Sequence, residues 1–175
     1  MTQLRVQFDA TRASRRLASV RAGAADLTAY HAVVANRLRN DTMRNFRSGG
    51  WWPGPWRPSR RASGMERGKT LMRTGTLRNG IRADHGRDYA AVGTSVPYAG
   101  VHQFGAVIPA RTVRPRNARA LRWFAGGRPV FAASARIPAT RIPARPFLPV
   151  RDGRLHPTTI AHNRRALRAH LRLEN

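Results

Sequence analysis

One segment comes near to a nucleotide-binding loop: residues 64–70 read Gly-Met-Glu-Arg-Gly-Lys-Thr. A Walker A loop has four residues between its glycines, and this spacing lets successive backbone amides wrap a phosphate. Here three residues separate Gly64 from Gly68, and the segment follows a Trp/Pro coil instead of a buried strand. The sequence therefore argues against nucleotide binding at Lys69.

No other group of residues has the composition of a catalytic or metal site. The six histidines are scattered, the chain has no cysteine, and no His-Glu-x-x-His motif occurs. Asp84, His85 and Ser95 supply the residue types of a hydrolytic triad, but no nucleophile elbow or oxyanion loop accompanies them. The chain holds only eight Asp and Glu, with no close pair for acid–base catalysis. We therefore predict a protein that is not an enzyme and uses no metal or cofactor.

The charge is extreme for a chain of 175 residues, with a formal net value of +25 and a pI near 12.0. Such a field repels other copies and attracts polyanions, so contact with nucleic acid is one explanation. The other is a GC-rich genome, because nearly every basic residue is Arg and Lys69 is the only lysine. Both explanations stay open.

The composition also predicts where the chain is used. Without cysteine it can form no disulfide, which suits a reducing cytoplasm. The N-terminus lacks the apolar region of a signal peptide, and no stretch approaches the roughly 18 apolar residues of a membrane span. Large core-forming side chains are sparse, since aromatics make up 7% of residues. We expect no membrane partner, and a small core that neighbouring proteins complete.

The N-terminal part of the sequence predicts one strand and a long helical region. Residues 4–8 alternate apolar and polar side chains, as a half-buried strand does. From Leu17 to about Phe46, apolar residues recur at helical spacing, with Gly23 as a possible break and Asp26 as a cap for the second half. Gly49 and Gly50 stop this helix.

Residues 51–58 form a Trp/Pro loop that cannot continue the helix. Trp51, Trp52 and Trp56 have two interpretations. Large aromatic side chains on an irregular segment are common at subunit or partner interfaces. Equally, they can fold back over the core of their own domain.

The middle of the chain predicts an α+β arrangement. Thr74-Gly75-Thr76-Leu77 resembles a capped turn that enters a short helix. Residues 81–85 and 89–93 flank a turn and form a strand pair. A brief helix follows from Ser95 to Phe104 and ends at Gly105.

The next stretch, 106–120, is rich in Arg and poor in apolar residues, and we predict a flexible loop there. Beyond it, residues 121–131 carry the pattern of a hairpin that turns at Gly126-Gly127. Prolines then space an extended segment up to Pro149. We expect this segment to reach a neighbouring subunit or partner, through Ile142, Arg145 and Phe147.

The chain should end in a basic helix or tail. Residues 157–175 place Arg164, Arg165 and Arg168 between apolar positions at helical spacing. Candidates for contact with DNA or a partner are these three and the arginines of the 106–120 loop, namely Arg111, Arg114, Arg116 and Arg119. No sequence-reading motif for nucleic acid occurs, so contact would be non-specific. The same charges also fit a merely solvated surface.

The predicted fold is therefore α+β, with a small antiparallel sheet packed by a long N-terminal helix and a short helix, plus extended loops or arms. We expect one domain over residues 1–156 and a separate basic helix or tail over 157–175.

Several short motifs in one order resemble the phage virion-morphogenesis, or tail-completion, family of Mu-like phages. They cover residues 46–150, about 60% of the chain. The signposts are Trp56-Arg57-Pro58, Lys69-x-Leu71-x-x-Thr74-Gly75-x-Leu77-x-x-x-Ile81, Val92-Gly93-Thr94-Ser95, Tyr98-Ala99-x-Val101-His102-Gln103-Phe104-Gly105 and Ile142-Pro143-Ala144-Arg145-Pro146-Phe147-Leu148.

The resemblance implies a tail-terminator-like structural subunit that forms a ring, with six-fold symmetry expected, at the head–tail junction of the virion. Its partners would be copies of itself, the tail tube protein, the head-closure or connector protein, and the double-stranded DNA that passes through the lumen. A head-closure ring, or a non-specific nucleic-acid-binding protein, is the alternative. Phe104 and Phe147 are the expected buried anchors.

Overall fold

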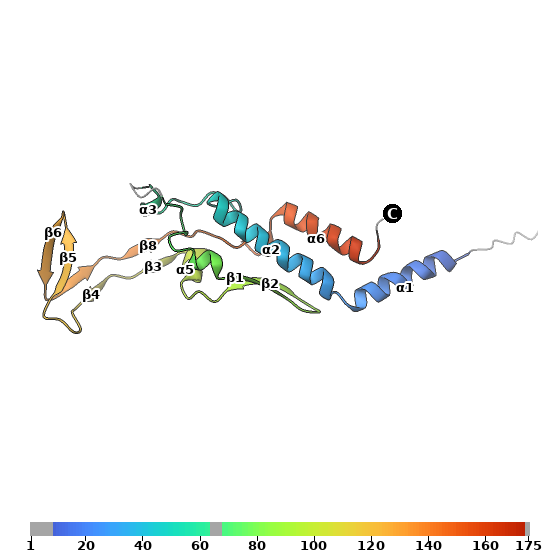
Figure 1. The fold of residues 1–175 in the computed structure, drawn as a ribbon, viewed down its shortest axis with the longest axis horizontal. Coiled ribbons are helices and arrows are strands. Elements are labelled where there is room, and N and C mark those ends of the chain that lie inside the picture. Colours follow the sequence, from blue (N-terminus) through green and yellow to red (C-terminus); the bar gives the residue numbers. More distant parts are fainter. Residues whose placement is uncertain (1–8, 64–67, 174–175) are drawn as a thin grey trace, which may run out of the picture. The chain divides into compact units, whose positions relative to one another are not determined.

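The computed structural model describes residues 9–63 and 68–173, which divide into two units. Of the described residues, 9–63, 68–96 and 146–173 form the helical unit, and 97–145 form the ribbon unit. Both are shown in Figure 1. The combination of helices with small antiparallel sheets confirms the predicted α+β class. The predicted strand at residues 4–8 lies outside the described residues, as do residues 64–67 of the glycine-spaced segment.

The helical unit begins with two consecutive helices, α1 (Thr11–Ala25) and α2 (Thr28–Ser48). The N-cap residue of α2 is Leu27, one position after the predicted Asp26, but Asp26 Oδ1 accepts a hydrogen bond of 2.9 Å from the first N–H of the helix, that of Thr28. Gly49 ends α2 in the left-handed conformation, with φ of 73°. The predicted break at Gly23 is wrong, because Gly23 lies inside α1 and the chain turns at Asp26 and Leu27 instead. Among the described residues, no helix is both long and apolar enough to cross a bilayer.

The core of the helical unit gathers around one face of α2. Phe46 is 1% exposed and packs against Trp56 and Phe147, with ring centroids 5.7 and 5.6 Å away. Further buried apolar side chains of this unit are Val34, Ala35, Leu38, Leu77, Ile81 and Pro149. The segment around Phe147 therefore returns to the first helices, far from it in sequence.

A short helix and a strand pair complete this face. Helix α4 (Thr76–Asn79) leads into β1 (Ile81–His85), which pairs antiparallel with β2 (Ala90–Thr94). These elements confirm the predicted turn, helix and hairpin, with β2 starting one residue later than expected. A further single-turn helix, α3, spans Arg60–Ser63.

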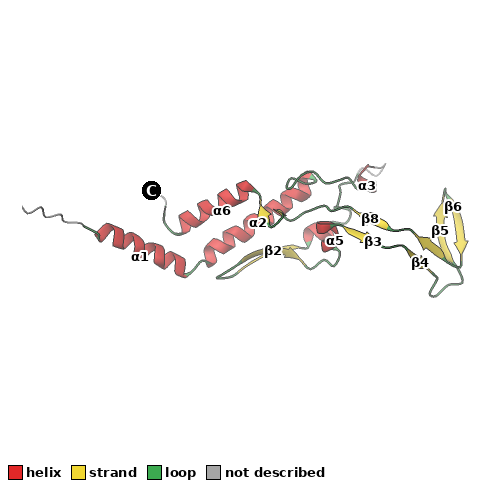
Figure 2. Cartoon of the chain, turned by 180° about the vertical axis from the view of Figure 1, so that it is seen from behind, coloured by secondary structure: helices red, strands yellow, loops and turns green. Residues whose placement is uncertain are grey.

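The C-terminal segment belongs to the helical unit. After the small pair β9 (Val150–Arg151) and β10 (Arg154–Leu155), α6 (Pro157–His170) lies alongside α2. The two helices are side by side in both Figure 1 and Figure 2. The helix itself confirms the prediction of a basic C-terminal helix, and its residue Thr159 is buried and donates a hydrogen bond to Asp41 of α2.

The ribbon unit begins with α5 (Ala99–Phe104) and continues as a two-stranded antiparallel ribbon. Strand β3 (Ala106–Ile108) pairs with β8 (Thr140–Ile142), and β4 (Arg111–Val113) pairs with β7 (Ala135–Ile137). Both pairs share one continuous register. The ladder is interrupted between them at Pro109 and Pro138, which have no N–H to donate.

The ribbon ends in a hairpin of β5 (Leu121–Ala125) and β6 (Arg128–Ala132). Gly126 and Gly127 form its turn with φ of 57° and 79°, as the sequence predicts. Residues 114–120 connect β4 to β5, whereas only residues 133–134 connect β6 to β7. The longer connection carries Arg114, Arg116 and Arg119.

The prediction of a flexible loop over 106–120 is wrong for its first half. Residues 106–108 and 111–113 are strands whose hydrogen-bonding partners lie about thirty residues later in the chain. The pairing is long-range, so local composition gave no sign of it. Only residues 114–120 remain a loop, and they hold most of the arginines that led to the prediction.

Candidate assembly interface

The terminal hairpin of the ribbon unit exposes large apolar side chains on both of its faces. Residues directly opposite in an antiparallel pair share a face, and successive residues alternate. One face therefore carries Trp123 opposite Val130, and the other carries Phe124 and Phe131. Phe124 and Phe131 are each 64% exposed, and Trp123 is 38% exposed. A two-stranded hairpin has little stability of its own in water, so these side chains have no core to join within the unit.

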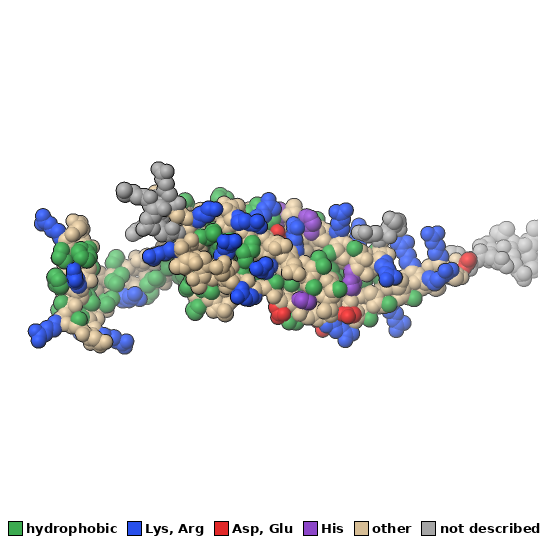
Figure 3. Space-filling view, viewed as in Figure 1, with side chains coloured by type: hydrophobic (Ala, Val, Ile, Leu, Met, Phe, Trp, Pro, Cys, Tyr) green, Lys and Arg blue, Asp and Glu red, His purple; other side chains and the backbone are tan. Residues whose placement is uncertain are grey.

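Arginine is interleaved with these aromatic rings. The Arg122 guanidinium lies 5.3 Å from the Phe124 ring centroid and 5.9 Å from that of Phe131. The planar cation covers part of the apolar face and keeps its charge in water. Figure 3 shows apolar and basic side chains together on this hairpin. Such a mixture of aromatic rings and arginine is typical of protein interfaces.

The ribbon unit contains no carboxylate. Residues 97–145 hold nine Arg and neither Asp nor Glu, so all eight acidic residues of the chain lie outside this unit. Among its predicted contact residues, Arg111 lies in β4 and Arg114, Arg116 and Arg119 in the 114–120 loop, and all four are exposed. The unit presents a strongly positive surface with no internal compensation.

Two further apolar side chains lie exposed near the base of the ribbon. Val107 is 69% exposed and Phe104 is 81% exposed. The expectation that Phe104 is a buried anchor is therefore wrong. Its place at the C-terminal end of α5 turns it outward, while Ala99 and Gln103 are the residues of this helix that are buried.

The base of the ribbon is closed by tight backbone contacts. The N–H of Arg145 donates to the carbonyl of His102 at 2.7 Å, and Ile142 in β8 pairs with Ala106. Gly105 has φ of 75° and ψ of 172°, a conformation open almost only to glycine. Arg145 is buried, at 8% exposure, and Ile142 is half-buried. Both predicted interface residues thus help to hold the base of the ribbon in this structure.

His102 is the titratable group with the clearest perturbation in the ribbon unit. Burial lowers its pKa, and the neighbouring Arg145 charge lowers it further. Its buried Nδ1 atom has no hydrogen-bond partner among the described residues. The neutral imidazole is therefore favoured.

The three tryptophans of the 51–58 loop have different environments. Trp56 is 6% exposed, and its Nε1 donates to the carbonyl of Pro146 at 2.8 Å. Trp51 and Trp52 are half-buried and contact the His156 ring at centroid distances of 4.3 and 4.8 Å. The Arg44 guanidinium lies 4.1 Å from the Trp51 ring. Trp51 and Trp52 thus keep a partly exposed edge.

Trp56 and Phe147 are core residues of the helical unit, and an interface role for them stays a prediction. Both side chains are buried against Phe46, at 6% and 1% exposure. For Phe147, the expectation of a buried anchor is confirmed. Of the two interpretations of the tryptophans, folding back over the core holds for Trp56.

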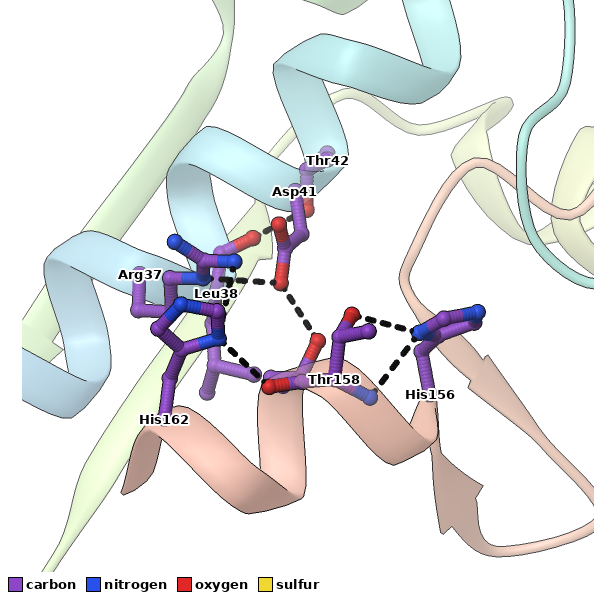
Figure 4. A network of polar contacts seen from close by, with 8 residues as sticks. Arg37, Leu38, Asp41, Thr42, His156, Thr158 and His162 are labelled. Carbon is purple, nitrogen blue, oxygen red and sulfur yellow. Dashed lines mark hydrogen bonds and ion pairs between the residues drawn. The ribbon is translucent and has the colours of Figure 1, made fainter. Parts of the chain in front are cut away.

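A polar network joins α2 to α6, as Figure 4 shows. Asp41 is 3% exposed, accepts a hydrogen bond of 2.6 Å from the Thr159 hydroxyl, and lies 3.5 Å from Arg37 Nε. His162 Nδ1 lies 2.6 Å from the Thr158 carbonyl and 3.3 Å from Arg37 Nη2. His156 Nδ1 accepts from the Thr158 N–H at the start of α6.

The contacts of this network hold α6 against α2 and cap the start of α6. Its only carboxylate is engaged by two partners. The Thr158 hydroxyl lies 2.7 Å from His156 Nδ1, but the same nitrogen accepts from the Thr158 N–H, so this pair caps the start of α6. Within residues 9–63 and 68–173, no group of three or more His, Cys, Asp or Glu is arranged to hold a metal ion. The predicted contact residues Arg164, Arg165 and Arg168 lie exposed on the same helix, away from these contacts.

Comparison with known families gives these features a context. The model of the phage virion morphogenesis family matches residues 8–158. The chain belongs to this family. The match runs from α1 through the ribbon unit to the start of α6, so it includes both units.

Two curated relatives agree with this family membership. The chain is 33% identical over 95 residues to the Mu-like prophage FluMu G protein 2 of Haemophilus influenzae, a match of 54% of this chain and 62% of the relative. It is 38% identical over 58 residues to the putative capsid assembly protein G of Escherichia phage Mu, covering 32% of this chain and 37% of that protein. The matches thus span less than two thirds of either relative. No solved structure matches the chain.

Family membership establishes a coarse role. A chain of the virion morphogenesis family has a structural or assembly role in a phage and is associated with the virion. Sequence reasoning missed the ribbon that extends from α5 to its terminal hairpin. The hairpin itself was visible through its Gly-Gly turn, but the strands that carry it were not.

Proposed function

We propose that this protein is a structural subunit of a ring at the head–tail junction of a tailed phage, where it completes the tail and joins it to the head connector. The observation that carries the proposal is the ribbon unit. Its strands pair only with each other among the described residues, and its terminal hairpin exposes aromatic side chains on both faces. A surface of this kind gains stability when neighbouring proteins cover it.

Assembly into a ring explains how a chain with one small core can be stable. In a closed assembly each subunit buries apolar surface against its neighbours, which adds stability that the isolated chain lacks. We expect six copies around the virion axis, with the tail tube protein on one side and the head-closure or connector protein on the other. Double-stranded DNA would pass through the lumen, near a minority of the arginines.

Electron microscopy tests this proposal. Purified protein should form rings in negative stain, and antibody labelling should place the protein at the end of the tail that meets the head. Tails assembled without the protein should fail to join heads. A chain that stays monomeric at high concentration and never associates with tail ends would rule the proposal out. A ring that copurifies with the portal and not with tails would favour the head-closure position.

A second candidate is non-specific binding of nucleic acid, favoured by the exposed arginines of α6 and of the 114–120 loop. Binding by phosphate contacts should weaken steeply with salt. Deleting residues 157–175 is a poor test, because Thr159 of α6 is buried against α2. Changing Arg164, Arg165 and Arg168 to Gln keeps the helix. If this triple variant binds duplex DNA with an unchanged salt slope, α6 has no such role.

A further inference from the structure

The terminal hairpin of the ribbon needs a partner surface that is both apolar and negatively charged. Its exposed aromatic side chains require apolar cover, and the ribbon unit brings nine Arg without any carboxylate. Pairing two ribbons edge to edge would bring these like charges together, which is unfavourable. A second ribbon is therefore a poor partner for the first.

The helical unit contains the complementary charge. Every carboxylate of the chain lies outside residues 97–145, and three exposed ones gather around the β1–β2 turn. Asp84 lies near the end of β1, next to this turn, and Asp88 lies in the turn itself. Arg87 of the turn donates to the Ala25 carbonyl at 2.8 Å, which brings Asp26 close to the same place. We call Asp26, Asp84 and Asp88 the acidic edge; acidic side chains are visible in this part of Figure 3.

The acidic edge also offers apolar surface. Tyr89 is 50% exposed, and its hydroxyl donates to Asp84 Oδ2 at 2.9 Å. This hydrogen bond and the nearby charge raise the pKa of Tyr89, so the ring stays neutral. A neutral aromatic ring flanked by carboxylates complements a hairpin of Phe, Trp and Arg side chains.

From this complementarity we propose that the terminal hairpin of each ribbon docks on the acidic edge of the next copy of this chain. The proposal rests on the ring described above and names the contact that builds it. Two different surfaces of one chain meet in such a contact, and head-to-tail contacts of this kind close into rings when the rotation between subunits allows it.

Engineered cysteines test the contact directly, because the chain has no cysteine of its own. Ala91 lies exposed in β2 opposite Asp84, and Ala125 lies exposed at the end of β5. Under mild oxidation, a variant with both Ala91→Cys and Ala125→Cys should give a ladder of covalent oligomers that ends at the closed ring. Each single variant should stop at no more than a dimer. The matched control joins Ala125→Cys with Ala161→Cys on the exposed side of α6 and should give no ladder.

Charge exchange tests the same contact without a disulfide. Asp88→Arg and Arg128→Glu should each weaken self-association in analytical ultracentrifugation by about tenfold, and the combination should recover most of this loss. Arg165→Glu on α6 is the matched control and should have less effect.

The outcomes separate this contact from the ring itself. If the wild-type chain assembles but the variant with Ala91→Cys and Ala125→Cys does not cross-link, the proposed contact is wrong and the proposed ring is unaffected. A disulfide within one chain, or equal ladders from the control pair, would also overturn it. If Arg128→Glu weakens binding to a 20-base-pair DNA duplex and leaves assembly unchanged, the hairpin serves nucleic acid instead. A wild-type chain that remains monomeric contradicts the ring as well.

Discussion

Asn45 and Trp52 exchange two hydrogen bonds at the end of α2. The Asn45 Oδ1 atom accepts from the N–H of Trp52 at 2.9 Å, and its Nδ2 donates to the carbonyl of the same residue at 3.1 Å. Oδ1 also accepts from the N–H of Trp51, and Nδ2 also donates to the carbonyl of Phe147. One fully buried amide therefore attaches the tryptophan loop and the returning C-terminal segment to the same helix.

Replacing Asn45 by Asp should destabilise the helical unit. The carboxylate keeps the shape but turns a donor into an acceptor that faces the carbonyls of Trp52 and Phe147. We expect a loss of about 3 kcal/mol in the free energy of unfolding, and a melting temperature lower by roughly 10 °C. Thermal and urea unfolding followed by circular dichroism measure this change. Asn40→Asp on the exposed side of α2 is the control, and equal melting temperatures for both variants would contradict the role of Asn45.

Much of the helical unit could be predicted because its signals are local. The apolar stripe of α2, the hydrogen bond from Thr28 to Asp26 at its start and the stop at Gly49 each depend on residues within a few positions of one another. The function of Asn45 could not be predicted in this way. A polar residue in a helix usually faces solvent, and its partners here include Phe147, about a hundred residues away.

The structure of the ribbon could be predicted even less well from local sequence signals. Its turn at Gly126-Gly127 is a local signal, whereas the pairing of β3 with β8 depends on contacts that sequence periodicity does not report. Pro109 and Pro138 made the segments resemble coil, although they interrupt the ladder only between its two parts.

Phe104 illustrates a second difficulty. An aromatic residue predicts burial, but the cover for this side chain is absent from the chain's own described fold.

The contact between Asp41 and Thr159 should couple α6 energetically to α2. The short hydrogen bond to a buried carboxylate is charge-assisted, and such bonds are stronger than neutral ones. In a double-mutant cycle of Asp41→Asn and Thr159→Val, we expect a coupling free energy of about 1–3 kcal/mol. Urea unfolding of the four proteins gives this value.

Hydrogen exchange adds a local measure of the same contact. Amides of α6 should exchange faster in Thr159→Val than in the wild type, because the helix opens more readily from α2. Asp152→Asn serves as the control, since this carboxylate is exposed in the turn between β9 and β10. Additive effects of Asp41→Asn and Thr159→Val would show that the two side chains do not act together.

His102 should make the base of the ribbon sensitive to acid. Its pKa in the folded chain is lowered from the ordinary value of 6.5 by burial and by Arg145. The unfolded chain therefore binds the proton more tightly, and folding stability falls as the pH drops through 6.5 toward the lower folded value. Above pH 6.5 the contribution is fully present. A two-dimensional NMR titration of the histidine rings, combined with hydrogen exchange of β3 and β8, tests the direction.

The variant His102→Gln should remove this part of the pH dependence, because its side chain does not titrate. His85→Gln in β1 is the control; it lies exposed in the helical unit and should leave the exchange of β3 and β8 unchanged at every pH. Ribbon amides that exchange equally at pH 5 and pH 7.5 in the wild type would contradict the prediction.

Gly105 sets the direction in which the ribbon leaves α5, and a side chain there should loosen the ribbon's base. A Cβ at this position would lie 2.9 Å from both the Ala144 nitrogen and the Ile142 oxygen, which belong to the returning strand and its continuation. Gly105→Ala should therefore cost roughly 2–4 kcal/mol locally, through strain and this clash. Amides of β3 and β8 should lose protection from exchange, while those of α2 keep theirs. Gly100→Ala is the matched control, because its Cβ would meet nothing within 4 Å and alanine favours the α5 helix. If the ribbon positions the terminal hairpin for assembly, Gly105→Ala should also weaken self-association measured by sedimentation, and Gly100→Ala should not.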